Sequence, residues 1–576
     1  MNSAVEKGRK PVPGGKSCGA VSHPARWGML GRGPSSQSER RIPMHRRLLL
    51  FFCTLILCFS LLVSRLADIA SQTTLLAAAG QQSATVLQVA ETRGTIYVRK
   101  MRPLTGIRTD YVAAVLPGDQ SADLLMRHTP EAQRTALLDR LTGGKPFLWP
   151  VDSGDLYARG VEVFPVEQRY LDRQPAVHLI GQLDPATGQG ASGLELAYDS
   201  LLSAAGGSLQ MRYFTNALGR GVSNTPAEKI DTGYRSGAGL VLTLDRELQQ
   251  LVEQAAQPLE RGAVVVMDPQ TGDLLACASV PAFNPNNPAA SMNDPDLPFL
   301  NRAFCAYSVG STFKLLTAAT ALEQGIPATR TYECRGAIEV LDQTFHCHNL
   351  NGHGLLDMQG AIEHSCNPYF ISLALGIGGA PLLYKAQQLG FGTAFEAAPG
   401  FSSYTGTLPD PRELTAPAAT ANFGFGQGSL TATPVQIACL VSAMVNGGGA
   451  VTPRLVAGSA TDGTLLTEPT AVYSPRQVFL PEATAQVREM MIAVVEEGSG
   501  TNAMPARGGA GGKTASAQTG QYVDGEEIVH AWFAGFYPAE SPRFVIVVLC
   551  EGGESGGDRA CPIFRDIADG IAALGL

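Results

Sequence analysis

The sequence predicts an α+β protein of several domains, with one transmembrane helix near its N-terminus. Three observations lead to this fold class. An uncharged apolar run covers residues 48–63, residues 70–236 mix strand and helix patterns, and residues 240–576 place short strands at both ends of a long Ala- and Gly-rich helical stretch. Strands separated by helices share a sheet when the two ends of the segment meet, as in an α+β layer. A chain of 576 residues has room for about two to four domains.

Composition and charge exclude two broad classes of protein. Hydrophobic residues make up 45% of the chain, which supplies real cores and excludes wholesale disorder. Residues 1–47 carry ten Lys or Arg and two Asp or Glu, whereas the rest of the chain has a net charge of −16. Such an acidic bulk argues against nucleic acid as a partner.

The apolar run is predicted to be a membrane anchor over residues 48–67. Its uncharged part falls short of the ~20 residues that span a bilayer, and the extension across Arg65 supplies the length if that side chain reaches the headgroups. A cleaved signal peptide is the alternative, but Ser64 to Ala67 is a poor cleavage site. The positive-inside rule places the N-terminus in the cytoplasm and the rest of the chain outside, because four arginines stand just before the run: Arg40, Arg41, Arg46 and Arg47.

Residues 1–47 are predicted to form a cytoplasmic basic tail. Their Gly-, Pro-, Ser- and Arg-rich sequence shows no apolar periodicity, which is typical of disorder. Met44 stands directly before the last arginines and the apolar run, so both Met1 and Met44 are candidates for the start of the protein.

Residues 70–236 are predicted to form a first, mixed domain. We expect strands at 93–97 and 111–116, and a helix over 131–141 that ends at the following glycines. A further helix begins at Gly193. The glycine-containing residues 231–239 are typical of a linker, and we place the domain boundary between 236 and 237.

Residues 237–576 are predicted to form the second domain. A strand at 240–244 and a helix at 246–256 open it. Two strands at 263–268 and 274–279 flank Pro269-Gln-Thr-Gly272, which is a hairpin signal. Two more strands and a last helix are expected at the C-terminal end, over 532–536, 544–549 and 562–574.

Ser311 and Lys314 are the first candidates for chemistry. They stand three positions apart at the start of a helix predicted over 310–322, so both side chains project from one face. A serine hydroxyl is a weak nucleophile until a base takes its proton, and burial lowers the pKa of a lysine enough to make it that base. A helix cap beside a surface lysine is the alternative. However, Lys314 is the only one of nine lysines with a serine three residues before it.

Two further motifs follow in an informative order. Ser365-Cys366-Asn367 comes 54 residues after Ser311, and Lys513-Thr514-Ala515-Ser516 comes 148 residues after Ser365. Each is weak alone, but together they match the Ser-x-x-Lys, Ser-x-Asn and Lys-Thr-Gly set of penicillin-interacting acyl transferases. The chain therefore resembles the class B, monofunctional penicillin-binding proteins, which are peptidoglycan D,D-transpeptidases.

The resemblance covers nearly the whole chain beyond the anchor. Arg93 to Tyr97, and Gly193 to Glu195 with Tyr198-Asp199, resemble motifs of the family's N-terminal pedestal. Four segments resemble landmarks of its transpeptidase domain: Leu242–Asp245, Asn301–Ala303, Gly426–Gln436 and His530–Gly535. The resemblance implies a pedestal, or dimerisation-type, domain over 70–236. It also implies a transpeptidase domain over 237–576, with an antiparallel sheet flanked by helices as in serine β-lactamases.

The resemblance also implies a role for each motif residue. Ser311 would attack the carbonyl between the two D-alanines of a stem pentapeptide, with Lys314 as general base. Ser365 would relay a proton to the leaving amine, together with Lys513, and Asn367 would hold Lys314 and the substrate amide. An amine of a neighbouring stem would then resolve the acyl-enzyme and form the cross-link, with no metal or diffusible cofactor. The substrate-binding residues would be Lys513, Thr514, Ala515 and Ser516, with backbone N–H groups of Ser311 and Ser516 as the oxyanion hole.

The implied partners are peptidoglycan stem peptides, β-lactams, the membrane and a SEDS-type glycosyltransferase of the elongation or division machinery. The competing functions are a D,D-carboxypeptidase or β-lactamase-like hydrolase, a non-catalytic cell-wall scaffold and a β-lactam sensor. The sequence does not distinguish division, elongation and sporulation, and it does not identify the acceptor amine.

Two positions depart from the family pattern. Ala515 stands where the third motif usually ends in glycine, and Val309 stands where proline usually precedes Gly310. Residues 513 and 515 of a strand share one face, so we expect the Ala515 methyl group to narrow the cleft and to slow acylation by bulky β-lactams.

The cysteines leave three alternatives open. Cys334 and Cys347 lie 13 residues apart and are candidates for a disulfide outside the cell. Cys347 with His346, His348 and His353 is a candidate metal site, although the spacing matches no tetrahedral pattern well. Free thiols are the third alternative.

Overall fold

A computed structural model of the protein describes residues 43–71, 84–222 and 225–576. The chain divides into two compact units, residues 1–82 and residues 83–576, and each is described by itself. The predicted basic tail lies outside the described residues up to position 42, and so does the candidate start at Met1. The other candidate start, Met44, is the first residue of helix α1.

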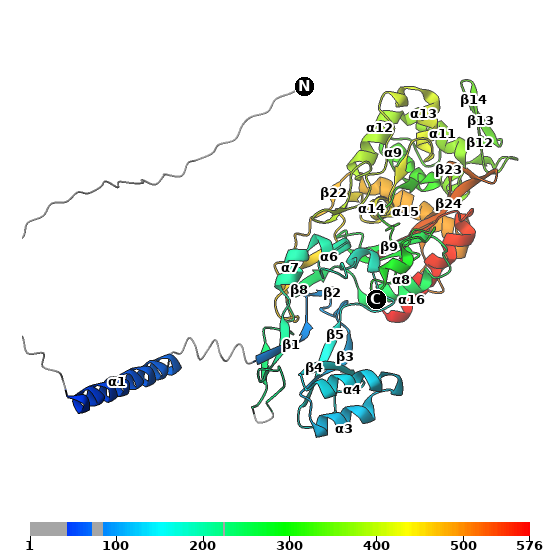
Figure 1. Ribbon diagram of the computed structural model, residues 1–576. Helices are drawn as coiled ribbons and strands as arrows, with labels where there is room; N and C mark the ends of the chain where they lie inside the picture. The colour runs from blue at the N-terminus through cyan, green and yellow to red at the C-terminus, as the bar shows by residue number, and fades with distance from the viewer. Residues whose placement is uncertain (1–42, 72–83, 223–224) are drawn as a thin grey trace, which may run out of the picture. The chain divides into compact units, whose positions relative to one another are not determined.

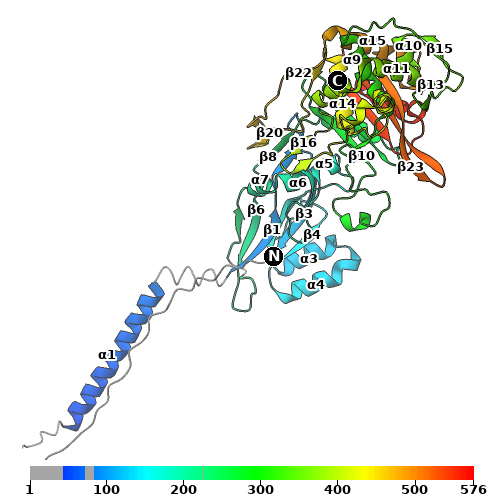
Figure 2. The ribbon, with the colours of Figure 1, turned by 90° about the horizontal axis from the view of Figure 1, so that it is seen from above.

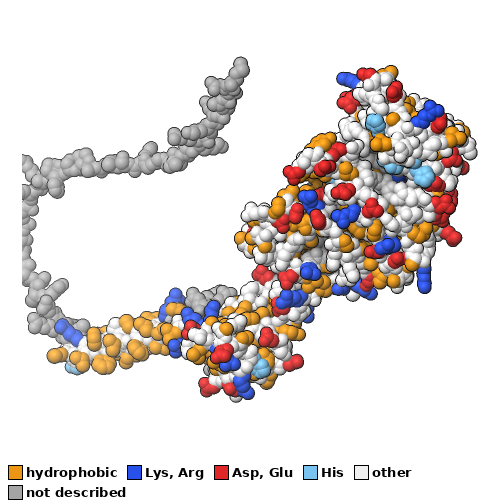
Figure 3. Space-filling view, turned by 90° about the vertical axis from the view of Figure 1, so that its right-hand side faces the viewer, with side chains coloured by type: hydrophobic (Ala, Val, Ile, Leu, Met, Phe, Trp, Pro, Cys, Tyr) orange, Lys and Arg blue, Asp and Glu red, His pale blue; other side chains and the backbone are white. Residues whose placement is uncertain are grey.

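Helix α1, Met44–Ser71, is the described element of the first unit. It is longer at both ends than the predicted anchor over 48–67. An α-helix rises 1.5 Å per residue, so its 28 residues extend for about 42 Å, more than the ~30 Å of a bilayer's hydrocarbon core. Its described side chains are exposed, and they form an almost continuous hydrophobic surface (Figure 3). Within the described residues it is the only single helix that is long and apolar enough to cross a membrane.

The second unit is elongated, with its N-terminal elements at one end and the C-terminal half of the chain at the other (Figures 1 and 2). Two three-stranded antiparallel sheets, ordered β1-β6-β7 and β4-β3-β5, build the first end. Helices α3 and α4 pack on the second of these sheets through Leu125 and Leu137. The elements are β1 Ala84–Glu91, β2 Thr95–Tyr97, β3 Arg108–Val115, α3 Asp119–His128, α4 Arg134–Gly143, β4 Phe147–Val151, β5 Val161–Gln168, α5 Val177–Ile180, α6 Gly193–Ala197, α7 Asp199–Ala204, β6 Ser208–Phe214 and β7 Glu228–Asp231.

The elements expected in this region are present with small shifts. The helix predicted over 131–141 begins as a 3₁₀ turn and continues as α4. It ends at Gly144, whose φ of 67° is left-handed and therefore favours glycine at this helix end.

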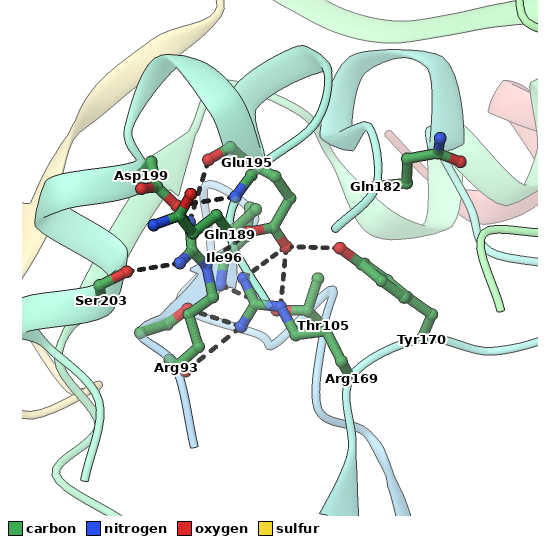
Figure 4. Close-up of polar contacts among 12 residues, drawn as sticks. Arg93, Ile96, Thr105, Arg169, Tyr170, Gln182, Gln189, Glu195, Asp199 and Ser203 are labelled. Atoms are coloured by element: carbon green, nitrogen blue, oxygen red, sulfur yellow. Dashed lines mark hydrogen bonds and ion pairs between the residues drawn. The ribbon is translucent and has the colours of Figure 1, made fainter. Parts of the chain in front are cut away.

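A buried ion-pair network joins the two sequence motifs at the base of this region (Figure 4). Glu195 is fully buried and accepts hydrogen bonds from Arg93 Nε and Arg169 Nε, each at 2.8 Å. Arg93 also donates to Asp199 Oδ1 at 2.8 Å, and the Tyr170 hydroxyl donates to Glu195 at 3.0 Å. Each charged group pairs with a group of opposite charge, and this pairing compensates the cost of burying the carboxylate. The motifs around residues 93 and 195 are therefore joined directly by buried ion pairs.

A mixed sheet connects the two ends of this unit. Strand β2 pairs in parallel with β8, Gly239–Leu242, which pairs in turn with β20, Val456–Ala460, and β20 pairs with β21, Leu466–Thr467. Ile96 of β2 belongs to the same hydrophobic core as Leu240 of β8. Residues 83–576 thus form one compact unit, and the domain boundary at 236/237 stays a prediction.

The second end is organised around a five-stranded antiparallel sheet, ordered β10-β9-β25-β24-β23. Strands from the two ends of residues 240–576 meet in this sheet, as predicted. The strand predicted over 240–244 does not join it, because it forms β8 of the mixed sheet. One face packs against α8, Arg246–Ala255, and α16, Cys561–Leu574. The other face packs against the helical middle of the chain. The strands are β9 Gly262–Met267, β10 Leu274–Val280, β23 Gly511–Val523, β24 Glu526–Tyr537 and β25 Phe544–Cys550.

The helical middle consists of seven helices: α9 Lys314–Glu323, α10 Met358–Glu363, α11 Asn367–Ile377, α12 Gly379–Gln388, α13 Pro417–Gly424, α14 Pro434–Val445 and α15 Pro481–Glu496. Short strand pairs connect them: β11 Tyr307–Ser308 with β18 Thr431–Ala432, β12 Tyr332–Cys334 with β15 Gly354–Leu356, β13 Ala337–Val340 with β14 Gln343–His346, β16 Glu396–Ala398 with β17 Phe401–Ser402, and β19 Gly449–Ala450 with β22 Arg476–Gln477. Apart from its last residue, α14 is buried along its whole length, so it forms the centre of this layer.

Candidate active site

Ser311 lies in a tight turn at the base of α9. The helix predicted from residue 310 begins as a 3₁₀ turn, Gly310–Phe313, and becomes α-helical at Lys314. Gly310 has a φ of 52°, and a side chain there would place its Cβ 3.0 Å from the Cβ of Ala517. Glycine is therefore needed both for the conformation and for the close approach of the turn to strand β23. The turn leaves Ser311 partly exposed to a cavity.

Lys314 is fully buried one turn after Ser311. Its Nζ donates to Asn367 Oδ1 and to the Ser365 carbonyl, both at 2.7 Å, and to Ser365 Oγ at 3.3 Å. Burial lowers the pKa of the Lys314 ammonium to about 7, because the charged form loses its hydration. The structure thus brings Lys314, Ser365 and Asn367 together, and the lowered pKa allows the Lys314 amine to lose its proton near neutral pH.

Ser365 occupies a strained turn between α10 and α11. Its φ of 52° lies in the left-handed region, which costs a non-glycine residue of order 1–3 kcal/mol. The two hydrogen bonds from Lys314 hold this conformation. Cys366 follows as the N-cap of α11, and Asn367 is the first residue of that helix. Asn367 Nδ2 donates to the carbonyl of His346 at 3.2 Å, so a neighbouring segment fixes the amide orientation.

The third motif lies on β23, at the edge of the five-stranded sheet. Lys513 is fully buried, and its Nζ donates to the Thr514 carbonyl at 2.9 Å. Burial, together with the nearby positive charge of Lys314, lowers the pKa of Lys513 well below its usual value. The hydroxyls of Thr514 and Ser499 are 2.7 Å apart, and Ser516 is exposed. An edge strand offers unpaired backbone groups to an extended ligand.

Ala515 does not present its methyl group openly to the cleft. Its side chain is 3% exposed and belongs to the core that contains Ala517. A Cβ built at Gly310 would lie 3.5 Å from the Cβ of Ala515, so the methyl group packs beside the turn that carries Ser311. Ala515 also contributes to the wall of the cavity that the three motifs share, so its effect on bulky ligands stays a prediction.

One cavity of about 650 Å³ is lined by residues of all three motifs. Ser311, Ser365, Asn367, Thr514, Ala515 and Ser516 contribute to its wall. Sequence reasoning missed further polar residues of the wall, which come from two connections: Ser499 and Asn502 before β23, and Glu554, Ser555 and Asp558 after β25. These loops are rich in glycine and contain no recognisable motif, so their few polar side chains are the one signal in the sequence.

The structure does not contain the disulfide considered above, because Cys334 and Cys347 are free thiols. The suggested set of Cys347 with three histidines is only partly brought together. The potential ligand atoms that cluster are those of Cys334, Cys347, His353 and Cys366, all within 4.8 Å of one another. Cys366, the middle residue of the second motif, was not considered as a ligand, because its role in that motif gave no reason to connect it with residues 334–353.

Comparisons with known proteins agree with this geometry. The model of the penicillin binding protein transpeptidase domain matches residues 262–569. The stage V sporulation protein D of Bacillus subtilis is 32% identical over 67% of this chain and 61% of its own length. The peptidoglycan D,D-transpeptidase MrdA of Acinetobacter baumannii is 30% identical over 71% of this chain and 63% of its own length. The matched regions therefore span about three fifths of these two relatives.

The fold agrees with a solved structure as well. The penicillin-binding protein PBP2 of Helicobacter pylori, in its complex with MreC, aligns with a TM-score of 0.61 and 23% identity, over 85% of this chain and 99% of that chain. At this level of identity the likeness supports the fold.

Proposed function

The chain belongs to the class B penicillin-binding proteins, and on that premise we propose that it is a penicillin-sensitive peptidoglycan D,D-transpeptidase acting through a serine acyl-enzyme. The observation that carries the proposal is the position of Lys314. Its buried Nζ bonds to Asn367 and Ser365, and these two residues line one cavity together with Ser311, one turn before Lys314. This arrangement supplies a nucleophile, a base and a second proton carrier in one cleft.

The first half-reaction forms the acyl-enzyme. Neutral Lys314 accepts the proton of Ser311 Oγ as this oxygen attacks the carbonyl carbon between the two D-alanines of a stem pentapeptide. The developing oxyanion is held by the backbone N–H groups of Ser311 and Ser516. The C–N bond then breaks, and D-alanine leaves with a proton relayed by Ser365. The pKa values of Lys314 and Lys513 are both lower than usual, so proton exchange among these groups is feasible near neutral pH.

The second half-reaction transfers the acyl group. An amine of a neighbouring stem peptide attacks the Ser311 ester, its proton returns through Lys314, and Ser311 is released as the cross-link forms. The exposed edge of β23 would align the donor strand, with the Thr514 hydroxyl and Ser516 near the terminal carboxylate. A β-lactam would enter the same path through its strained amide and remain on Ser311.

Hydrolysis of the acyl-enzyme is the competing reaction, and it defines a carboxypeptidase or β-lactamase-like enzyme. No specific observation favours it over transfer to an amine. A non-catalytic scaffold would not need a buried lysine with a lowered pKa beside a serine, since such a group is costly to bury without a task.

We place the protein in the cell membrane, anchored once by α1, with its N-terminus in the cytoplasm and the catalytic unit outside. The basic residues before the apolar run support this orientation. The Helicobacter pylori relative forms a complex with MreC. A partner of that kind, and a SEDS-type glycosyltransferase, are the partners we propose for the pedestal and anchor.

Labelling with a fluorescent penicillin tests the acyl-enzyme. The detergent-solubilised full chain should become labelled on a Ser311 peptide, and Ser311→Ala should abolish the label. Incubation with pentapeptide stems should release D-alanine and yield a dimeric peptide. Persistent labelling of Ser311→Ala would contradict the nucleophile, whereas release of D-alanine with water as the sole acceptor would favour the hydrolase.

A further inference from the structure

The Ser311 side chain makes no hydrogen bond of its own. Among the residues that the structure describes, its Oγ has no hydrogen-bond partner, so the backbone must place this oxygen. Helix α9 holds the 3₁₀ turn on its C-terminal side. Strand β11, Tyr307–Ser308, leads into the turn on the N-terminal side, with one residue between them. Whatever fixes β11 therefore also fixes the position of the proposed nucleophile.

Strand β11 cannot fix its own position. It consists of two residues and forms a two-stranded sheet with β18, which is equally short. Two strands alone are only marginally stable in water. Between β11 and the serine stands Gly310, whose left-handed φ of 52° allows a sharp bend but supplies no side-chain contact. The position of β11 must therefore come from side chains that reach it from other elements.

The first of these side chains is the indole of Trp532. Trp532 lies on β24, opposite Ala515 of β23, and it is fully buried. Its Nε1 donates a hydrogen bond to the Ser308 carbonyl at 3.0 Å. A buried indole N–H needs an acceptor, and this one finds it in the backbone of β11. The bond therefore ties β11 to the sheet that carries the third motif.

The second contact joins Tyr307 to a carboxylate. Its hydroxyl donates to Glu551 Oε1 at 2.5 Å, and its ring meets His530 edge-on, with the ring centres 5.3 Å apart. Hydrogen bonds to an ionised acceptor are shorter and stronger than neutral ones. Burial and the charge of Glu551 both raise the pKa of Tyr307, so the hydroxyl keeps its proton and remains a donor.

Glu551 is itself held in place. Arg302 Nε donates to Glu551 Oε1 at 3.1 Å, and the Arg302 side chain is 2% exposed. The other guanidinium nitrogens of Arg302 donate to the carbonyls of Asp296, at 2.7 Å, and Leu297, at 3.3 Å. The Glu551 backbone N–H donates to the Arg261 carbonyl at 2.9 Å. The carboxylate that receives Tyr307 is thus a fixed point of the fold.

We propose that Tyr307, Trp532 and Glu551 are positioning residues, which hold β11 and thereby place Ser311 for attack on the substrate carbonyl. None of the three is among the residues that line the cavity, so their effect must pass through the backbone of the turn. A misplacement of about 1 Å costs a reaction of this kind roughly 100-fold in rate. The proposal rests on the proposed function, because its measure is the acylation of Ser311.

Tyr307→Phe is the primary test, because it removes one hydroxyl and keeps the ring. The first-order rate constant of acylation by saturating penicillin should fall by about 10- to 100-fold, whereas the dissociation constant of the preceding complex should change little. The pH at half-maximal rate should stay at about 7, since the contacts of Lys314 are unchanged. Stopped-flow labelling of the detergent-solubilised full chain at several penicillin concentrations separates the two constants. Trp532→Phe, which removes the donor to Ser308, should slow the same step.

Tyr170→Phe is the matched control. The Tyr170 hydroxyl also donates to a buried carboxylate that is paired with arginine, Glu195, at 3.0 Å, but in the pedestal. Both substitutions remove a hydroxyl from a buried charged group, so both should lower the temperature of thermal unfolding. Only Tyr307→Phe should slow acylation. Equal slowing by the two would show a general loss of stability and would overturn the positioning role.

Hydrogen exchange supplies a readout that does not depend on activity. Tyr307→Phe should increase amide exchange in the peptide that covers residues 305–313, and Tyr170→Phe should leave exchange there unchanged. An unchanged acylation rate in Tyr307→Phe, or unchanged exchange in this peptide, would contradict the proposal. A wild-type protein that is not acylated at Ser311 would instead overturn the proposed function.

Discussion

At the scale of single residues, Lys314 determines how the rate should depend on pH. The general base must be neutral, and the pKa of Lys314 is lowered to about 7 by burial. The neutral fraction therefore rises as the pH increases through about 7 and levels off above it. We predict that the rate of penicillin acylation rises with pH by about tenfold per unit well below pH 7 and reaches a plateau above about pH 8. Stopped-flow labelling across this range measures it, and a flat profile would contradict Lys314 as the base.

Substitution of Lys314 tests its role in acylation in a second way. Lys314→Ala should reduce acylation by about 10²–10⁴-fold, the usual contribution of a general base. The exposed Lys145 is a matched control, and Lys145→Ala should leave the rate unchanged. Near-UV circular dichroism should confirm that both variants keep their tertiary packing.

Replacing Ala515 with glycine separates two explanations of how its methyl group affects the acylation rate. If the group crowded the ligand, Ala515→Gly would speed acylation by roughly 5- to 150-fold, which corresponds to about 1–3 kcal/mol of relieved misfit. Its buried position beside Gly310 predicts instead a change in rate of less than about fivefold and a loss of stability of about 1 kcal/mol, from backbone entropy and lost packing. Acylation rates and thermal unfolding of the two proteins decide between these outcomes. A large acceleration would restore the steric explanation.

At the scale of elements, the buried network around Glu195 should govern the stability of the pedestal. Glu195→Gln leaves the guanidinium groups of Arg93 and Arg169 without their shared carboxylate. We predict a loss of about 3–5 kcal/mol in the free energy of unfolding, as for other buried pairs that lose one partner. Calorimetry of the purified protein should show a transition at lower temperature.

The control for this prediction is an ion pair at the surface. Glu228 pairs with Arg212 at 2.9 Å, and both side chains are exposed to solvent. Glu228→Gln should change the stability by less than about 0.5 kcal/mol. Equal effects of the two substitutions would show that the buried network does not hold the pedestal elements together.

Within residues 240–576, the sequence predicts the regular helices and strands well and the irregular turns and short strands poorly. The β9–β10 hairpin, α8 and α16 lie where turn signals and apolar spacing place them. The strand pairs between residues 332 and 356 have three or four residues per strand, too few for a periodic pattern. The left-handed Ser365 and the 3₁₀ turn at Ser311 are set by tertiary contacts with Lys314 and with β23. Local propensity could not predict them.

The sequence likewise predicts only part of the candidate site. The residue types and order of the three motifs predicted Ser311, Lys314, Ser365, Asn367 and the β23 residues as one group. The structure brings Ser311, Ser365, Asn367 and residues 514–516 to one cavity, with Lys314 buried and bonded to Ser365 and Asn367. Cys366 as a possible ligand, and Ser499 beside Thr514, depend on contacts between segments that are distant in sequence. Such contacts leave no local signature.

At the scale of the whole molecule, the orientation in the membrane is the testable property. We predict a single pass through α1, with residues 84–576 outside the cell, because basic residues precede the apolar run. Protease added to intact protoplasts should remove the catalytic unit, while a cytoplasmic marker protein stays intact. Full protection of the catalytic unit until detergent is added would reverse the topology.

The parallel pairing of β2 with β8 has a consequence for how such a protein is inherited. A gene fragment that begins near residue 237 would encode the Ser311, Ser365 and Lys513 motifs. It would lack the strand that covers one edge of β8, and with it the side chain of Ile96 that fills the shared core. An exposed strand edge of this kind invites pairing with other chains. Recombination at the linker would therefore yield aggregation-prone products. We therefore expect the two halves of the gene to be inherited together. The catalytic half depends on the three residues of β2, which are encoded about 140 positions before its own first strand, β8.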